Sequence, residues 1–244
     1  MKARIKVVSN GFARAFGLEM VPIWRKDSLH FERFLRELFA LYSVDGVVDV
    51  GANLGQYRDF VRLQVGFEGW IVSFEPDPSC VAQLRERAKS DRKWHIEPVA
   101  LGRESGQLDF HVTADSHFNS FLLAAKQGSV AEQYKTKSRV IRDEKAAIRT
   151  LDGYEPLFAK FGIARPYLKL DTQGFDLEVM RGAPGYLRKV RALQTEASVR
   201  AIYEGMPDYR ETVDFLAQRG FDLSGTFPVC HDAALRLIEF DCVA

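Results

Sequence analysis

The sequence feature that most constrains the fold is a short apolar run, Val47 to Val50, that ends in the turn Gly51-Ala52-Asn53-Leu54-Gly55. A segment with apolar residues at helical spacing, 56–63, follows it. This order predicts a buried strand, a tight turn and a helix. Glycine lets a backbone bend sharply and come close to a ligand. The same turn also suits a plain connection between strand and helix, so it does not assign a function by itself.

Strands and helices are predicted to alternate along the rest of the chain. The other apolar runs that predict strands lie at 70–74, 94–100, 107–113, 167–171, 192–197, 221–227 and 235–243. Helical spacing predicts helices at about 79–89, 176–187 and 209–219. Such alternation is typical of an α/β fold whose parallel sheet is covered on both faces, here with a closing antiparallel pair of strands.

Residues 1–46 are predicted to form a helical extension that packs on the core. Apolar residues at helical spacing follow Ser28, a residue type that can cap a helix. Nearer the start, the apolar residues of 5–16 can share one helix face beside basic side chains. This face either packs on the domain or makes a peripheral contact with a membrane.

The segment 114–147 is polar and basic, and its apolar residues follow no clean period. We expect a mobile, lid-like insertion near 114–147 instead of regular structure. Its lysines and arginines favour either an anionic acceptor or a plain solvated surface.

The overall composition excludes several partners. The chain has 34 basic and 33 acidic side chains and a formal net charge of +1, so we expect no nucleic acid partner. No segment approaches the roughly 18 consecutive apolar residues of a membrane-spanning helix. Cys80, Cys230 and Cys242 form neither a zinc-like cluster nor a CxxC pair, which predicts reduced thiols in a cytoplasmic protein.

An acidic residue, Glu75, follows the next predicted strand and lies 24 residues after Gly51. A carboxylate at this place can accept both hydroxyl protons of a ribose, so the two features together predict a nucleoside ligand. The dinucleotide pattern has a glycine where this chain has Asn53, and Asp49 would repel a pyrophosphate. S-adenosylmethionine instead carries an ammonium and a sulfonium, which suit Asp49. An alternative role for Asp49 is to cap or brace the turn.

Five blocks of the sequence resemble the FkbM family of methyltransferases. The blocks are Val47 to Tyr57, Phe74-Glu75-Pro76, Val99-Ala100-Leu101-Gly102, Asn119-Ser120 and Leu168 to Ala183. The resemblance implies one methyltransferase domain over 47–244. It also implies a Rossmann-like class I methyltransferase fold, with a mostly parallel seven-stranded sheet, helices on both faces and a C-terminal antiparallel strand.

The same resemblance implies the activity, which is the transfer of a methyl group from S-adenosylmethionine to a hydroxyl of a sugar, glycan or other natural product. The acceptor is therefore expected to be a small molecule or a glycan. The residues that the resemblance places at the cofactor are Asp49, Gly51, Asn53, Gly55, Glu75 on the ribose and Ala100 at the adenine.

Methyl transfer to an alcohol needs an in-line approach and a base that takes the hydroxyl proton. Asp171, at the end of a predicted strand, is the first candidate for this base, and Glu196 is the second. His117 is the third, because the ordinary pKa of histidine lies near neutrality. Each has a structural alternative, which is bracing of a turn for Asp171, an ion pair with Lys169 for Glu196 and plain solvation for His117.

Three further polar residues, Asn119, Ser120 and Gln173, are predicted to bind the substrate or polar atoms of the cofactor. An ordinary turn favours the same residue types at 119 and 120. The FkbM pattern has Glu or Gln after Asp171-Thr172, and Gln173 removes one candidate carboxylate. We therefore expect no metal site.

Two other classes of function remain open at this point. A nicotinamide-dependent oxidoreductase would also use Glu75 for a ribose, although Asn53 and Asp49 argue against it. A non-catalytic protein could retain the fold and bind a glycan or another partner. The intact cofactor blocks argue against this alternative.

Overall fold

The computed structural model describes residues 16, 21–26 and 28–244. The amphipathic face predicted within 5–16 therefore lies outside the described residues, apart from Phe16. Among the helices of the described part, none is both long enough and apolar enough to cross a bilayer.

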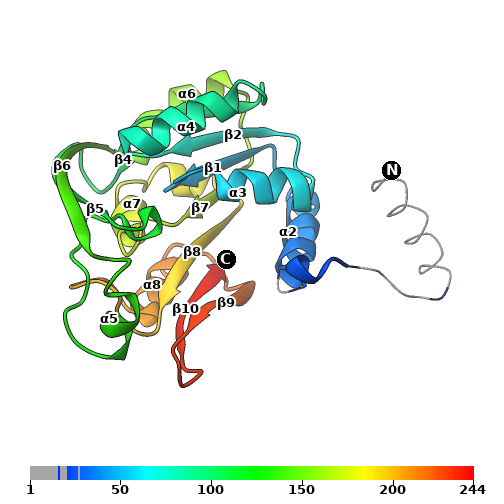
Figure 1. The fold of residues 1–244 in the computed structure, drawn as a ribbon. Helices are drawn as coiled ribbons and strands as arrows, with labels where there is room; N and C mark the ends of the chain where they lie inside the picture. Colours follow the sequence, from blue (N-terminus) through cyan, green and yellow to red (C-terminus); the bar gives the residue numbers. More distant parts are fainter. Residues whose placement is uncertain (1–15, 17–20, 27) are drawn as a thin grey trace, which may run out of the picture.

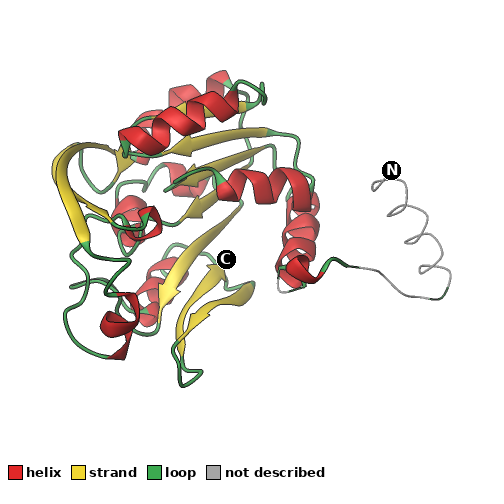
Figure 2. Cartoon of the chain, in the orientation of Figure 1, coloured by secondary structure: helices red, strands yellow, loops and turns green. Residues whose placement is uncertain are grey.

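A seven-stranded sheet forms the centre of the molecule, in the order β3-β2-β1-β7-β8-β10-β9 (Figures 1 and 2). Its strands are β1 (Gly46–Val50), β2 (Trp70–Phe74), β3 (Trp94–Glu97), β7 (Pro166–Leu170), β8 (Ala192–Ser198), β9 (Gly225–His231) and β10 (Leu237–Val243). Neighbouring strands pair in parallel, except that β10 runs antiparallel to both β8 and β9. This arrangement confirms the predicted class I methyltransferase fold.

Helices cover both faces of this sheet (Figure 2). They are α2 (Leu29–Leu41), α3 (Gln56–Phe60), α4 (Pro78–Ala88), α5 (Ser129–Tyr134), α6 (Glu155–Lys160), α7 (Asp176–Arg181) and α8 (Tyr209–Ala217). Short helical turns lie at Ile23–Arg25, Val61–Val65, Ser116–Phe118, Leu151–Tyr154 and Tyr186–Arg188.

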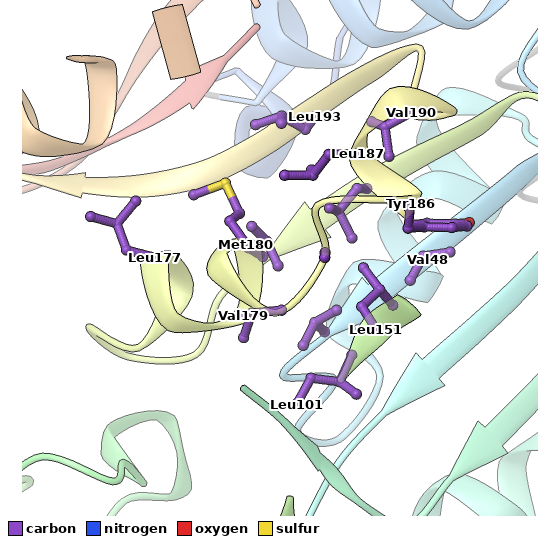
Figure 3. Packing of buried hydrophobic residues seen from close by; sticks show 14 of the residues in the cluster. Val48, Leu101, Leu151, Leu177, Val179, Met180, Tyr186, Leu187, Val190 and Leu193 are labelled. Atoms are coloured by element: carbon purple, nitrogen blue, oxygen red, sulfur yellow. The ribbon is translucent and has the colours of Figure 1, made fainter. Parts of the chain in front are cut away.

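Successive residues of the central strands point to opposite faces and pack in two separate cores. Val48 and Leu168 belong to the first core, which also contains Met180 of α7 and is drawn in part in Figure 3. Val47 and Tyr167 belong to the second. The sheet is thus buried on both faces, which explains why its parallel strands appear in the sequence as continuous apolar runs.

The predicted helix after Ser28 is present as α2. Its residues Leu35, Leu38 and Phe39 pack in the second core, together with Val61 of the turn that extends α3. This part of the N-terminal extension therefore contacts the core of the sheet. The domain boundary at residue 46 stays a prediction.

A second, three-stranded sheet has the order β4-β6-β5. It consists of β4 (Ala100–Leu101), β5 (Gly106–Thr113) and β6 (Val140–Arg149). The expectation of irregular structure near 114–147 is therefore wrong for 140–147, which pairs antiparallel with β5, and for 129–134, which forms α5. Half of the residues of β6 are exposed and many are charged, so its hydrophobic periodicity is weak. A lid role for 114–139 stays a prediction.

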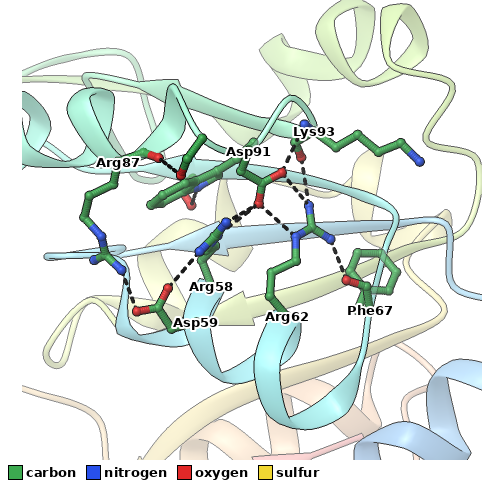
Figure 4. A network of polar contacts seen from close by, with 10 residues as sticks. Arg58, Asp59, Arg62, Phe67, Arg87, Asp91 and Lys93 are labelled. Atoms are coloured by element: carbon green, nitrogen blue, oxygen red, sulfur yellow. Dashed lines mark hydrogen bonds and ion pairs between the residues drawn. The ribbon is translucent and has the colours of Figure 1, made fainter. Parts of the chain in front are cut away.

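An ionic network fixes the helical segment that follows the glycine turn (Figure 4). The carboxylate of Asp91 accepts hydrogen bonds from Arg58 and Arg62, with shortest N–O distances of 2.6 and 2.9 Å. Asp59 joins Arg58 to Arg87 of α4. Burial disfavours the ionised form of Asp91, but the hydrogen bonds from the two guanidinium groups outweigh it and lower the pKa of this carboxyl.

We expect Asp91→Ala to lower the free energy of unfolding by about 2–3 kcal/mol, because two largely buried guanidinium groups lose their shared anion. Urea denaturation at neutral pH would measure this loss. Asp109→Ala is the matched control, because it removes an exposed carboxylate paired with Lys145. The control should change stability by less than about 0.5 kcal/mol. Equal stability of the two variants would contradict the role given to Asp91.

Candidate active site

A cavity of about 560 Å³ lies at the carboxyl ends of β1, β2 and β7 and extends over β8 and β10. Parallel α/β sheets bind ligands at this edge, and the volume is typical of a ligand pocket. Nine of the twelve residues predicted for the site line the cavity. The other three, Asp49, Gly55 and Ser120, lie behind its lining.

The glycine turn joins the ends of three strands. Gly51 has a φ of 79°, and a Cβ atom at this residue would lie 1.9 Å from the carbonyl oxygen of Asp171. The Gly51 N–H donates to the carbonyl oxygen of Phe74, at 3.0 Å. Gly55 has a φ of 83°, and its Cβ would lie 2.8 Å from the Trp94 ring. At Gly51 a side chain would collide with backbone atoms. At Gly55 the positive φ is the main reason for glycine, because side chains disfavour this left-handed conformation.

Glu75 holds the turn and at the same time lines the cavity. One of its carboxylate oxygens accepts the backbone N–H of Asn53 and the other accepts that of Asp77, each at 2.8 Å. The residue is only 5% exposed, and burial raises the pKa of its carboxyl to about 7. Each oxygen keeps a second lone pair, so Glu75 can still accept two hydroxyl protons from a ligand.

A buried lysine, Lys169, lies between two of the predicted site residues. Its Nζ is 3.1 Å from Asp49 and 3.3 Å from Asp171, and it donates to the carbonyl oxygen of Gly51 at 3.3 Å. Asp49 also accepts a hydrogen bond from Ser73 Oγ, at 3.0 Å. These contacts favour the bracing role of Asp49 over direct contact with a ligand.

Gln173 connects the two leading candidates for the base. Its amide nitrogen donates to Asp171 at 2.8 Å and to Glu196 at 3.2 Å. The hydroxyl of Tyr203 donates to the Gln173 carbonyl at 2.8 Å and thereby orients the amide. The ion pairs of Lys169 go to Asp49 and Asp171, so the alternative that pairs it with Glu196 is wrong. Burial, with Asp171 nearby, raises the pKa of Glu196 well above its ordinary value.

The segment with His117, Asn119 and Ser120 lies against the strand ends through hydrogen bonds. The side chain of His117 is 60% exposed, and its Nδ1 lies 2.8 Å from a carboxylate oxygen of Asp115. Asn119 accepts the backbone N–H of Thr113 at 2.9 Å, and Ser120 Oγ donates to the backbone carbonyl of residue 173 at 2.7 Å. Asn119 and His117 still line the cavity.

Two carboxyl groups on β10, Glu239 and Asp241, and the amide of Gln194 on β8 were not among the predicted site residues. All three line the cavity. Two acidic residues at a spacing of two in an otherwise apolar strand were the available signal, because that spacing places both on one face. In the described part of the chain, no group of three or more potential ligands is placed to hold a metal ion.

Comparison of the sequence with models of known protein families decides the class of enzyme. The model of the FkbM methyltransferase domain matches residues 49–223. The chain belongs to the FkbM methyltransferase family. Membership confirms the predicted class of enzyme and its expected cofactor, S-adenosylmethionine. It also removes the nicotinamide-dependent oxidoreductase as an alternative.

Two curated proteins and one solved structure are similar to this FkbM methyltransferase. The 2-O-methyltransferase NoeI of Sinorhizobium fredii is 27% identical, over 75% of this chain and 74% of its own length. The hexuronic acid methyltransferase AglP of Haloferax volcanii is also 27% identical, over 77% of this chain and 71% of its own. The crystal structure of magnesium protoporphyrin IX methyltransferase from Synechocystis has a TM-score of 0.45 and 11% identity, over 99% of this chain and 95% of its own.

We expect the affinity for S-adenosylmethionine to fall about tenfold from pH 8 to pH 6. The pKa of Glu75 is about 7 in the free protein, so its carboxylate is mostly ionised at pH 8 and mostly protonated at pH 6. Hydroxyl donors bind the ionised form more strongly. Calorimetric titration at the two pH values measures the change.

Glu75→Gln is the control for this pH dependence. The substitution keeps the shape of the side chain but removes the titrating carboxyl group. The variant should bind S-adenosylmethionine more weakly, and this affinity should change little between pH 6 and pH 8. An equal dissociation constant of the unaltered protein at both pH values, or an unchanged pH dependence in the variant, would remove Glu75 from cofactor binding.

Proposed function

We propose that this FkbM methyltransferase transfers a methyl group from S-adenosylmethionine to a hydroxyl group of a sugar or a related natural product. The supporting observation is the combination of the glycine turn and Glu75 with a cavity that carries carboxyl groups over β8 and β10. The name of one relative, a 2-O-methyltransferase, supports transfer to an oxygen atom, and that of the other, a hexuronic acid methyltransferase, supports a sugar as the acceptor.

The residues of the cavity suit the proposed cofactor, which supplies the methyl group on a sulfonium. Glu75 has a free lone pair on each oxygen for the two ribose hydroxyls. Ala100 offers an apolar surface for the adenine. The backbone near Gly51 and Asn53 borders the space left for the methionine part of the cofactor. Asp49 acts from beneath the lining, by holding Lys169 in place.

We assign the role of base to Asp171. Its carboxylate lines the cavity and is held by Lys169 and by the amide of Gln173. It takes the proton of the acceptor hydroxyl while the new O–C bond forms and the C–S bond breaks. Glu196 lines the cavity beside Gln173, and burial raises the pKa of its carboxyl well above the ordinary value; we assign it a hydrogen bond to the acceptor.

Orientation of the acceptor supplies most of the expected rate enhancement. Well-oriented reactants gain roughly 7–11 kcal/mol, whereas a general base adds roughly 3–5 kcal/mol. Asn119, Gln173 and the exposed His117 are the residues that we propose for contact with substrate or cofactor, since all three line the cavity. Ser120 supports them from behind, through its hydrogen bond to the backbone.

The acceptor is proposed to be a small molecule or a glycan, and the place of action to be the cytoplasm. The three cysteines of the chain are free thiols, which agrees with a reducing compartment.

Titration calorimetry with S-adenosylmethionine, S-adenosylhomocysteine and NAD tests the first half of the proposal. We expect both sulfur nucleosides to bind and NAD not to bind. Transfer of a labelled methyl group to sugars or to cell extract tests the second half. Binding of NAD alone would reject the proposed function. Binding of the sulfur nucleosides without transfer to any acceptor would indicate a non-catalytic protein that retains the fold.

Once a methyl acceptor is identified, its methylation can be assayed with variants of the base. Asp171→Asn should lower kcat by about 10²–10⁴-fold, because no carboxylate then takes the proton of the hydroxyl. Affinity for the cofactor should stay within about twofold, since the amide keeps the shape of the carboxylate. Glu196→Gln should lower kcat less, since it keeps a hydrogen-bonding group of the same size. Full activity of Asp171→Asn would place the base elsewhere.

A further inference from the structure

Three carboxyl groups from two neighbouring strands lie together at the far side of the cavity from Glu75. Asp241 of β10 pairs directly with Glu196 of β8, and Glu239 pairs with Ser198. Residues that face each other across two strands, and residues two apart along one strand, point to the same face of a sheet. The three carboxyl groups therefore share one face, and all of them line the cavity.

Cations do not balance these carboxyl groups within the cavity. Lys169 is the one lysine or arginine among the described residues that line it, and its ammonium is already shared by Asp49 and Asp171. The ionisable residues of the lining are Tyr57, Glu75, Cys80, His117, Tyr134, Lys169, Asp171, Glu196, Cys230, Glu239 and Asp241. The side over β8 and β10 is thus acidic.

Neutral donors, not cations, hold the carboxyl groups in place. Ser198 Oγ donates to Glu239 at 2.6 Å, and Gln173 donates to Glu196 at 3.2 Å. Each carboxyl group keeps lone pairs that these donors do not occupy. The cluster can therefore accept several further hydrogen bonds from a ligand.

Placing like charges opposite each other destabilises a sheet, and burial adds to the cost. Burial raises the pKa of Glu239 to about 7 and that of Asp241 to about 6. Part of the cluster is therefore ionised near neutral pH, although no ion pair among the described residues joins it to a cation and Lys169 acts on Asp241 only from a distance. Such an arrangement is typical of a functional site.

We propose that this acidic side of the cavity binds an acceptor sugar without an acidic group, through hydrogen bonds from the hydroxyls of the sugar to Glu196, Glu239 and Asp241. This inference rests on the proposed function and narrows its acceptor. A sugar with a carboxylate would place this negative charge against these acidic side chains, and the described lining of the cavity offers no unpaired lysine or arginine to balance it. Such pairing of like charges costs several kcal/mol. Sugars with an acidic group are thereby rejected.

Matched pairs of sugars test the inference directly. The probes are the methyl glycosides of glucose, galactose and mannose, each compared with the methyl glycoside of its uronic acid, in which a carboxylate replaces the primary alcohol. Their binding is measured by NMR titration to protein saturated with S-adenosylhomocysteine. We expect at least one neutral glycoside to bind, and its uronic counterpart to bind at least about tenfold more weakly.

The double variant Glu239→Gln/Asp241→Asn tests the cause of this selectivity. It keeps hydrogen-bonding groups of similar size, so the ratio between neutral and acidic sugar should fall towards one. Asp109→Asn is the control, because Asp109 is exposed and pairs with Lys145 outside the cavity, and it should leave the ratio unchanged. Affinity for S-adenosylhomocysteine within about twofold shows that each variant is folded.

Several results would overturn the inference. They are a uronic acid that binds the unaltered protein as tightly as its neutral partner, no binding by any of the glycosides, or an unchanged ratio in the folded double variant. The comparison within the unaltered protein remains decisive if the double variant does not fold. Transfer of a labelled methyl group to a uronic acid would leave the proposed function intact and reject this inference alone.

Discussion

The buried ammonium of Lys169 is the interaction on which the site depends. A lysine side chain out of contact with water is costly unless its charge is matched. Burial opposes the charge here, but Asp49 and Asp171 outweigh it and raise the pKa of the ammonium. Because Lys169 lies on β7 and Asp49 on β1, the ion pair between them joins the ends of these two strands, while Asp171 directly follows β7 and pairs with the same ammonium. The close approach of Gly51 to Asp171 depends on the spacing of these ends.

The same lysine belongs to a polar row that crosses four neighbouring strands. Ser73, Asp49, Lys169 and Gln194 occupy successive paired positions on β2, β1, β7 and β8. The hydroxyl of Tyr57 donates to Gln194 at 2.9 Å and closes the row from above. The row runs beneath the cavity, so the cofactor side and the acceptor side share one support.

Patterns within short stretches of the sequence correctly predicted the features that depend on neighbouring residues along the chain. The buried strands appear as apolar runs, and the spacing from Gly51 to Glu75 led to a carboxylate that lines the cavity. Features that depend on which strands become neighbours were missed or misassigned. Lys169 pairs with Asp49, and not with Glu196 as the structural alternative had it, because strand order places β1 beside β7. Glu239 and Asp241 were missed because β10 enters the sheet between β8 and β9. The strand β6 was missed because its exposed, charged face hides the period of a strand.

The position of β10 also has a consequence for synthesis on the ribosome. Domains form from their N-terminal part onwards as the chain emerges. The glycine turn, Glu75 and Asp171 precede β8, whereas Glu239 and Asp241 lie on the strand that emerges after all the others. Since β10 inserts between β8 and β9, the nascent sheet exposes the edge of β8 until β10 arrives. The side chains that would distinguish one acceptor from another are therefore synthesised after those of the cofactor side.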